Sequence, residues 1–390
     1  MYNFSAVRKI VAGPEAINSL GKEVKNLHLK KEKVLIVTDK GVMKAGVIDK
    51  ALKPLKEEGI KFEIFDEVEP NPTDIIMDRG GQYLRKINAE AVIGIGGGSS
   101  MDSAKAISAI GCNKGSVKEY FSYLNLSPEP FENQPKPLIV VPTTSGTGSE
   151  MTPFSVITDT KTNIKRDVFT WQFAPLVAIT DPLLTISLPP KITAETGIDA
   201  FVHALEAYTS RDSNPFGDAN AYYAMKLIVN NIRKAYADGK NIEARTNMMI
   251  GSTLAGKACG NVLLGIVHAL GEAIGGRYNA PHGLTMAVCL PFSMEYNFIA
   301  NPDRFADITR LLGKNTNGLS TVDAARLSVD AVRELLNDLD IKEDIKLMGV
   351  KEDSLSLLAE EALGSCFTDS NPRSVKLEDY KQLLSKLYFR

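Results

Sequence analysis

Residues 91–105 read AVIGIGGGSSMDSAK, and they give the strongest indication of the fold class. It begins as an apolar run that is typical of a buried strand, and it passes through three glycines at 96–98 directly into a helical pattern. Glycine lacks a side chain, so the backbone there can approach a bulky anion closely. Exposed N–H groups at the start of the following helix would then stabilise the negative charge. The stretch therefore predicts a phosphate-binding strand–loop–helix unit.

The unit departs from the common dinucleotide fingerprint. G-x-G-x-x-G would need a glycine at position 99, where the chain has Ser99. We expect Ser99 to be the N-cap of the helix, with Asp102 three residues later completing a capping box. A tight turn without a ligand is the alternative, since glycine clusters often follow strands.

The sequence on both sides of this unit alternates short β-branched runs with longer amphipathic stretches. This pattern predicts an α/β domain with a parallel sheet covered by helices. Residues 154–180 look like shorter strands, which could form a hairpin covering one edge. The expected strands are 34–38, 61–65, 91–95 and 138–141, with helices over about 42–58 and up to about residue 87.

The pattern changes beyond the Pro189-Pro190 pair. From Thr193 onward, long helix-period segments dominate and no convincing strand remains. We place the domain boundary near residue 185, which gives a dinucleotide-binding domain over 1–185 and an all-helical domain over 186–390.

Composition excludes several classes of partner. A net charge of −2 and the lack of a long basic block argue against nucleic acid and anionic membranes. The N-terminus has no apolar core of a signal peptide, and no stretch approaches the roughly 20 apolar residues of a membrane span. The cysteines are far apart, without a C-x-x-C pair, which favours reduced thiols and a cytoplasmic location. They are Cys112, Cys259, Cys289 and Cys366.

A second polar cluster, PTTSGTGSE at residues 142–150, follows the strand 138–141. Ligands of open α/β sheets bind at the carboxyl ends of strands, and the hydroxyls and N–H groups there could hold a ribose or a carboxamide. A loop that satisfies its own backbone groups is the alternative.

Asp39 ends the earlier strand 34–38. A carboxylate at that position can bind a ribose diol and would repel a 2′-phosphate, which favours NAD over NADP. A simple helix N-cap is the alternative interpretation.

The helical half holds three of the four histidines of the chain. Asp199 and His203 are four residues apart, so they share one face of a helix. With His268 and His282 they offer one carboxylate and three imidazoles, a set that suits a divalent first-row metal with an open position for substrate. A histidine satisfied within an apolar core and an Asp–His contact on a helix surface are the alternatives.

These residues resemble a known family, the iron-containing (group III) alcohol dehydrogenases. The resemblance covers essentially the whole chain and is most like lactaldehyde reductases and related short-chain alcohol dehydrogenases. It implies the dehydroquinate synthase-like two-domain fold and a homodimer or higher homo-oligomer. The motifs that carry it are GGGSSMDSAK, PTTSGTGSE, TGIDAFVHALEAYTS, GIVHALGEAIGGRYNAPHG and CFTDSNPR.

The same resemblance implies roles for individual residues. The metal would be held by Asp199, His203, His268 and His282, with His268 and His282 also counted as catalytic. The cofactor-binding residues that it implies, together with Asp102 from the predicted glycine-loop helix, are Asp39, Asn71, Gly97, Gly98, Ser99, Thr143, Thr144, Thr147 and Lys165.

Two departures from the family pattern concern catalysis and the substrate. Many members have a second histidine four residues after the third ligand, where this chain has Glu272, which shares a helix face with His268 and could still relay protons. In the implied substrate pocket, Phe154 replaces the asparagine of lactaldehyde reductases, and Cys259 and Cys366 stand where other pocket residues would be.

The expected activity is transfer of hydride between NAD(H) and a small primary alcohol or aldehyde, with Fe²⁺ as the metal on the strength of the resemblance. Zn²⁺ is the second candidate, because affinity alone favours it at such a site. Two other functions stay open at this point. One is a non-redox metal enzyme that uses NAD internally, like dehydroquinate synthase, and the other is a silent nucleotide-binding scaffold.

Overall fold

The computed structural model describes residues 2–122 and 131–390. The chain forms two compact units, one over Ser5–Leu188 and the other over Pro189–Arg390 together with residues 2–4. The division lies close to the predicted boundary at residue 185. The first residues, which the prediction assigned to the first domain, pack with the helical unit instead: the ring of Phe4 lies 5.8 Å from that of Phe216.

The first unit contains a sheet of six parallel strands in the order β1-β8-β5-β4-β2-β3. The expected parallel sheet with flanking helices is therefore confirmed, and all four expected strands belong to it. The strands are β1 (Lys9–Ala12), β2 (Lys33–Asp39), β3 (Lys61–Val68), β4 (Ala91–Gly96), β5 (Leu138–Pro142) and β8 (Val177–Thr180).

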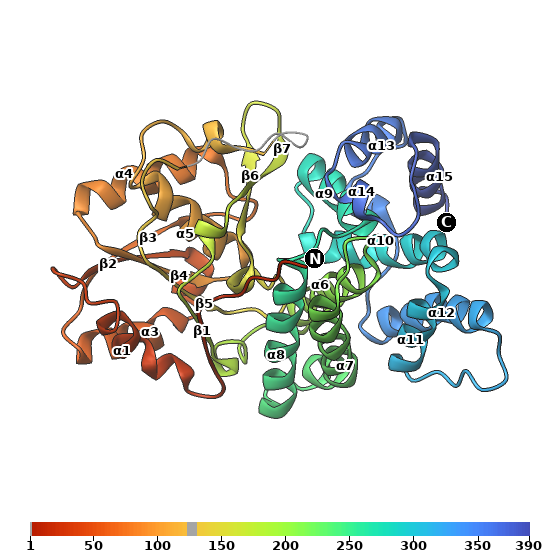
Figure 1. The fold of residues 1–390 in the computed structure, drawn as a ribbon, viewed down its shortest axis with the longest axis horizontal. Coiled ribbons are helices and arrows are strands. Elements are labelled where there is room, and N and C mark those ends of the chain that lie inside the picture. Colours follow the sequence, from red (N-terminus) through yellow and green to blue (C-terminus); the bar gives the residue numbers. More distant parts are fainter. Residues whose placement is uncertain (1, 123–130) are drawn as a thin grey trace. The chain divides into compact units, whose positions relative to one another are not determined.

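Helices cover both faces of this sheet (Figure 1). Successive residues of a strand point to opposite faces, so Val34 and Ile36 pack into one buried cluster and Leu35 and Val37 into another. Helices α1 and α3 complete the first cluster, and α4 and α5 complete the second. The helices of this unit are α1 (Leu20–Lys25), α2 (Lys40–Lys44), α3 (Val47–Glu57), α4 (Asp74–Ile87) and α5 (Gly98–Ile110).

Three details differ from the expectations. The predicted helix over 42–58 is two helices, because Gly46 at φ 68° interrupts it between α2 and α3. The segment 154–180 contributes β8 to the main sheet, and its hairpin, β6 (Phe154–Asp159) with β7 (Ile164–Phe169), forms a separate two-stranded sheet. Strand β1 was not predicted, because a stretch of four residues is too short to show a strand pattern; three of the four are exposed.

The order of the strands places a switch of direction between β2 and β4. From β2 the chain moves outward to β3, returns to β4 on the other side of β2, and continues to β5 and β8. Ligands of open α/β sheets bind at the carboxyl ends of strands at such a point. Asp39 ends β2 and Gly96 ends β4, and a Cβ atom at Gly96 would lie 3.1 Å from the Oδ2 atom of Asp39.

Residues 189–390, all of which the structure describes, contain helices and no strand. Helix α6 is the most buried of them, with few exposed positions along its twenty residues, as expected for a helix that is apolar on most sides. The α-helices are α6 (Pro190–Thr209), α7 (Pro215–Ala237), α8 (Ile242–Cys259), α9 (Ile266–Tyr278), α10 (His282–Asn297), α11 (Pro302–Leu311), α12 (Thr321–Asp338), α13 (Leu355–Leu363), α14 (Phe367–Ser370) and α15 (Leu377–Tyr388).

A search of the described part of the chain found no helix that combines the length and the apolar character needed to cross a bilayer.

Candidate functional site

Three helices of the second unit bring the predicted metal ligands together. Asp199 and His203 lie one turn apart on α6, His268 lies in the first turn of α9, and His282 is the first residue of α10. One ligand atom from each side chain lies within 4.8 Å of the ligand atoms of the other three. Residues separated by more than 80 positions thus converge on one point.

Distances within this cluster are short enough for a shared cation. The Nε2 atoms of His203 and His268 are 3.2 Å apart. The Oδ1 atom of Asp199 lies 3.4 Å from Nε2 of His282 and 3.7 Å from Nδ1 of His203. One carboxylate and three imidazoles fit a divalent first-row metal, which tolerates mixed oxygen and nitrogen ligands.

His282 is the most exposed of the four side chains in the cluster. The side chains of Asp199, His203 and His268 are buried, whereas that of His282 is 29% exposed. A substrate oxygen would therefore approach the cluster from the side of His282. An open coordination position is what distinguishes a catalytic metal site from a structural one.

The surroundings of His203 and His268 shift the pKa values of the two imidazoles in opposite directions. Burial holds the pKa of His203 well below its usual value, and the neighbouring His268 lowers it further. The ring of His203 is therefore neutral and offers a lone pair. Burial also lowers the pKa of His268, but the hydrogen bond with Glu206 and its charge outweigh this effect and raise that pKa.

Glu206 is a residue of this site that the sequence reasoning did not single out. Its Oε2 atom lies 2.6 Å from Nδ1 of His268, and its side chain is buried. A signal was present: Asp199, His203 and Glu206 follow one another at i, i+4 and i+7, which is one stripe of a helix.

Glu272 lies one turn after His268 on α9, as the sequence predicted. Its side chain is half-buried, and its charge is among the causes that raise the pKa of His268. The two residues are therefore electrostatic neighbours.

The first unit brings the predicted cofactor loops together. A Cβ atom at Gly98 would lie 2.8 Å from Cγ2 of Thr147, and one at Gly97 would lie 3.7 Å from Cγ2 of Thr144. The glycine loop after β4 and the hydroxyl-rich loop after β5 are thus in contact, because β4 and β5 are neighbours in the sheet. Thr143 is buried in the same loop.

Ser99 is not the N-cap of α5, so this prediction was wrong. The helix begins at Gly98, its N-cap is Gly97, and no side chain caps it. The physical reason is that the glycines let the helix start earlier than the polar residues would suggest. This arrangement suits an anion site, since the first N–H groups of the helix donate to no N-cap side chain.

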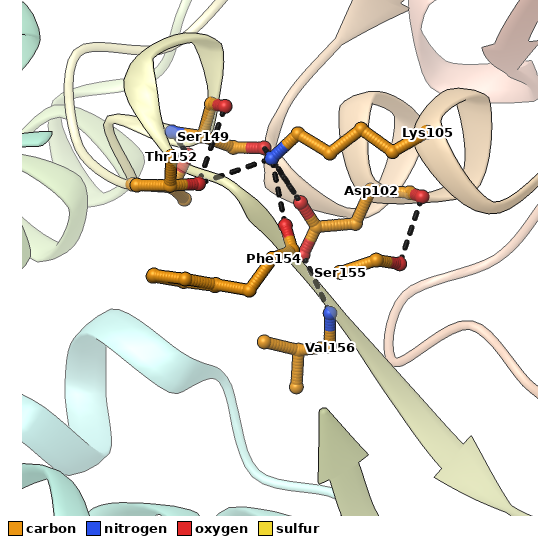
Figure 2. Close-up of polar contacts among 8 residues, drawn as sticks. Asp102, Lys105, Ser149, Thr152, Phe154, Ser155 and Val156 are labelled. Carbon is orange, nitrogen blue, oxygen red and sulfur yellow. Dashed lines mark hydrogen bonds and ion pairs between the residues drawn. The ribbon is translucent and has the colours of Figure 1, made fainter. Parts of the chain in front are cut away.

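Asp102 also differs from its predicted place in a capping box. Its Oδ1 atom accepts a hydrogen bond from Ser149 at 2.6 Å and contacts the ammonium group of Lys105 at 3.2 Å. Its Oδ2 atom accepts from the N–H of Val156 at 3.0 Å. Figure 2 shows this carboxylate pointing at the loop after β5 and at β6, so Asp102 joins α5 to both.

Lys105 is fully buried at the centre of these contacts (Figure 2). Its ammonium group donates to the hydroxyl of Ser149 at 2.8 Å, to the hydroxyl of Thr152 at 3.0 Å and to the carbonyl of Phe154 at 2.8 Å. A buried ammonium group needs such partners, because moving a charge out of water without a partner costs several kcal/mol of free energy. The lysine therefore fixes the hydroxyl-rich loop to the helix that follows the glycine loop.

Asn71 and Lys165 approach each other through Thr158. The carbonyl of Asn71 accepts a hydrogen bond from the hydroxyl of Thr158 at 3.3 Å, and Thr158 pairs with Lys165 across the hairpin. Asn71 adopts a left-handed conformation, with φ 54°. The hairpin thus brings Lys165 near the loop that follows β3.

The three predicted pocket residues lie in different units. Phe154 begins β6 in the first unit, where its ring lies 6.0 Å from Nζ of Lys105. Cys259 ends α8 in the second unit and is buried. Cys366 is exposed and precedes Phe367, whose ring meets that of His268 edge-on at 5.7 Å. Cys366 therefore directly precedes a residue that contacts one of the metal-ligand candidates.

Comparison with known proteins agrees with this geometry. Residues 7–182 match the model of the iron-containing alcohol dehydrogenases, and residues 193–388 match the C-terminal model of the Fe-containing alcohol dehydrogenase family. The chain is 42% identical to 1,3-propanediol dehydrogenase from Citrobacter freundii, covering 96% of each chain. It is 41% identical to sulfoacetaldehyde reductase from Bilophila wadsworthia, covering 97% of each. A crystal structure of 1,3-propanediol oxidoreductase superposes with a TM-score of 0.94 at 40% identity over both full chains.

Proposed function

Since the chain belongs to the iron-containing alcohol dehydrogenase family and is a metal-dependent oxidoreductase acting on alcohols or aldehydes, we propose that it moves hydride between NAD(H) and a small primary alcohol or aldehyde. The observation that carries this proposal is the convergence of four ligand atoms within 4.8 Å in a largely buried cluster. The names of the relatives support the substrate class, because both refer to short primary alcohols or aldehydes.

Asp199, His203, His268 and His282 would hold the metal, which we propose to be Fe²⁺. A divalent ion there supplies a Lewis acid for the substrate oxygen, and a bound nicotinamide supplies or accepts the hydride. Membership of an iron-containing family supports iron, while ligand chemistry alone would favour Zn²⁺.

The residues of this chain perform the remaining tasks. The burial that keeps His203 neutral keeps its lone pair available to the ion. The partly exposed side of the cluster, at His282, would admit the substrate, while the burial of the other three ligands would keep most of the solvent out. Glu272, one turn from His268, would pass a proton between the substrate oxygen and water.

The first unit would bind NAD(H) at the switch between β2 and β4. The N-terminus of α5, which no side chain caps, would bind the pyrophosphate, as helix N-termini do for anions. Thr144 and Thr147, which contact the glycine loop, would bind the neighbouring part of the cofactor. Asp39 at the end of β2 would accept hydrogen bonds from a ribose diol, which supports NAD over NADP.

An absorbance assay at 340 nm tests this proposal. The protein is reconstituted anaerobically with either Fe²⁺ or Zn²⁺. It is then mixed with NADH or NADPH and a panel of short aldehydes. We expect one NADH to be oxidised for each aldehyde reduced, with the iron-loaded protein active. Metal-loaded protein that binds NADH yet oxidises none with any aldehyde of the panel would contradict the proposal and favour a non-redox use of NAD.

A further inference from the structure

Helix α9 carries His268 in its first turn but has no cap of its own. Its N-cap residue is Gly265, which has no side chain to accept hydrogen bonds from the first N–H groups. Buried N–H groups without acceptors are costly, so partners must come from elsewhere.

Two buried side chains that are distant in sequence supply these acceptors. The Oε1 atom of Glu206, on α6, accepts from the N–H of Val267 at 2.7 Å. The Oδ1 atom of Asn371, just after α14, accepts from the N–H of Ile266 at 3.3 Å. The start of α9 is therefore capped by residues about 60 and 100 positions away, as the sequence numbering shows.

The glycine at position 265 makes this approach possible. A Cβ atom there would lie 2.8 Å from Oε1 of Glu206 and 3.0 Å from Oδ1 of Asn371. Real Cβ atoms are rarely that close to an oxygen, so a side chain at this position would push both acceptors away.

Asn371 is itself fixed with its oxygen toward α9. It exchanges two hydrogen bonds with the side chain of Asn297, at 2.9 Å and 2.7 Å, and its amide group also donates to the carbonyl of Arg373 at 2.7 Å. These contacts set which end of the amide is the acceptor. They also give a role to CFTDSNPR, a motif that the metal cluster alone does not use.

The second carboxylate oxygen of Glu206 determines which ring nitrogen of His268 carries the proton. A carboxylate only accepts hydrogen bonds, so the 2.6 Å contact between Oε2 and Nδ1 places the proton of the ring on Nδ1. The lone pair of the ring then lies on Nε2, which faces His203 and the centre of the cluster at 3.2 Å.

We propose that Glu206 and Asn371 act as positioning residues for the metal centre: both fix the start of α9, and Glu206 also sets the tautomer of His268 that binds the ion. This inference rests on the proposed metal site and adds to it the reason for its affinity. A carboxylate behind a metal-binding imidazole makes the ring a stronger donor and typically accounts for 10- to 100-fold in metal affinity.

The decisive variant is Glu206→Gln. Its amide oxygen can accept from Nδ1 of His268 or from the N–H of Val267, and in either orientation its amide hydrogens oppose the remaining donor. We expect metal affinity, measured by competition with a chelator using Co²⁺ or Zn²⁺, to fall about 10- to 100-fold. The visible absorption spectrum of the Co²⁺ protein should also change, because the geometry at His268 changes.

Two further variants separate positioning from stability. Asn371→Ala should weaken metal binding less than Glu206→Gln, because it removes one acceptor at the start of α9 and leaves the tautomer of His268 unchanged. Asn214→Ala is the matched control: Asn214 is a buried N-cap of α7 in the same unit and accepts from the N–H of Gly217. Its loss should lower the thermal stability and leave metal affinity and the Co²⁺ spectrum unchanged.

The outcomes distinguish this inference from the function on which it rests. Wild-type protein that binds neither ion would overturn the metal site itself. Wild-type protein that binds Co²⁺ while Glu206→Gln binds it equally well, with the same spectrum, would overturn the positioning role alone. If Glu206→Gln does not fold, Asn371→Ala decides, and unchanged metal affinity in that variant counts against the inference.

Discussion

The hydroxyl of Ser100 donates a hydrogen bond to the Oδ2 atom of Asp39 at 2.8 Å, so the residue that ends β2 is tied to the first turn of α5. The Oδ1 atom of Asp39 accepts from the N–H of Val42 at 3.0 Å and caps α2. The helix N-cap that we gave as the alternative interpretation of Asp39 is therefore present. A carboxylate has about four acceptor sites, so these two hydrogen bonds leave acceptor capacity for a ribose diol.

The charge of Asp39 gives the first prediction. Asp39→Asn keeps a good N-cap but removes the charge that would repel a 2′-phosphate. We expect the ratio of kcat/KM for NADPH to that for NADH to rise by about tenfold or more, which corresponds to about 1.4 kcal/mol. Asp39→Gly should relax the selectivity in the same direction. If neither variant changes the ratio, Asp39 is only a cap.

Lys105 gives a prediction about stability. Lys105→Met would leave the carboxylate of Asp102 without its cation, and breaking such a buried pair from one side costs about 3–5 kcal/mol. We expect urea unfolding to show a loss of this order. The KM for NADH should rise as well, because the loop that contains Ser149 would no longer be held against α5.

An exposed lysine serves as the control for that experiment. Lys53 pairs with Glu57 on the surface of α3, with both side chains largely exposed. Lys53→Met should leave unfolding and KM close to the wild-type values. Equal effects of the two substitutions would show that the buried contacts of Lys105 contribute no more to stability and NADH binding than an exposed ion pair does.

Thiol chemistry tests the position of Cys366. This side chain is exposed, whereas Cys289 is buried and burial raises its pKa to about 12. A maleimide should therefore modify Cys366 in the folded protein and leave Cys289 intact, as peptide mapping would show. Because Cys366 adjoins Phe367 at the ring of His268, modification should raise the KM for aldehydes, and Cys366→Ser should abolish this effect. An unchanged KM would remove Cys366 from the substrate pocket.

Glu272 is tested by its pH dependence. If it passes protons, Glu272→Gln should lower kcat by about 10²-fold and remove one limb of the pH profile, while metal content stays the same. Glu243, exposed in the first turn of α8, provides the control variant Glu243→Gln. Matching profiles for the two variants would assign Glu272 to packing.

Much of this fold follows from local patterns. The β-branched run that forms β2 and the glycines after β4 are strong signals, because burial on both faces demands apolar residues and a tight approach demands glycine. Strand β1 gave no such signal, because its apolar run is only three residues long (residues 10–12) and is too short to show a strand pattern. The break at Gly46 was also missed, because a helical period continues on both sides of it.

The site was predictable only in part for a similar reason. Spacing linked Asp199 to His203, but nothing local linked either to His268 or His282, and only the resemblance to a family joined them. Ser99 was misassigned because polar residues after glycines look like caps. Glu206 shares a helix stripe with Asp199 and His203, but its hydrogen bonds to α9, like those of Asn371, join distant segments and leave no periodic trace in a sequence.

The most direct test compares wild type with His268→Ala in two measurements. The metal content of each purified protein is determined by mass spectrometry, and its aldehyde-dependent oxidation of NADH is followed by absorbance. We predict about one divalent ion per chain in the active wild type, and loss of both the ion and turnover in the variant, with NADH binding retained. A variant that reduces aldehydes at the wild-type rate, or a wild type that keeps full activity after its metal is removed, would contradict the account.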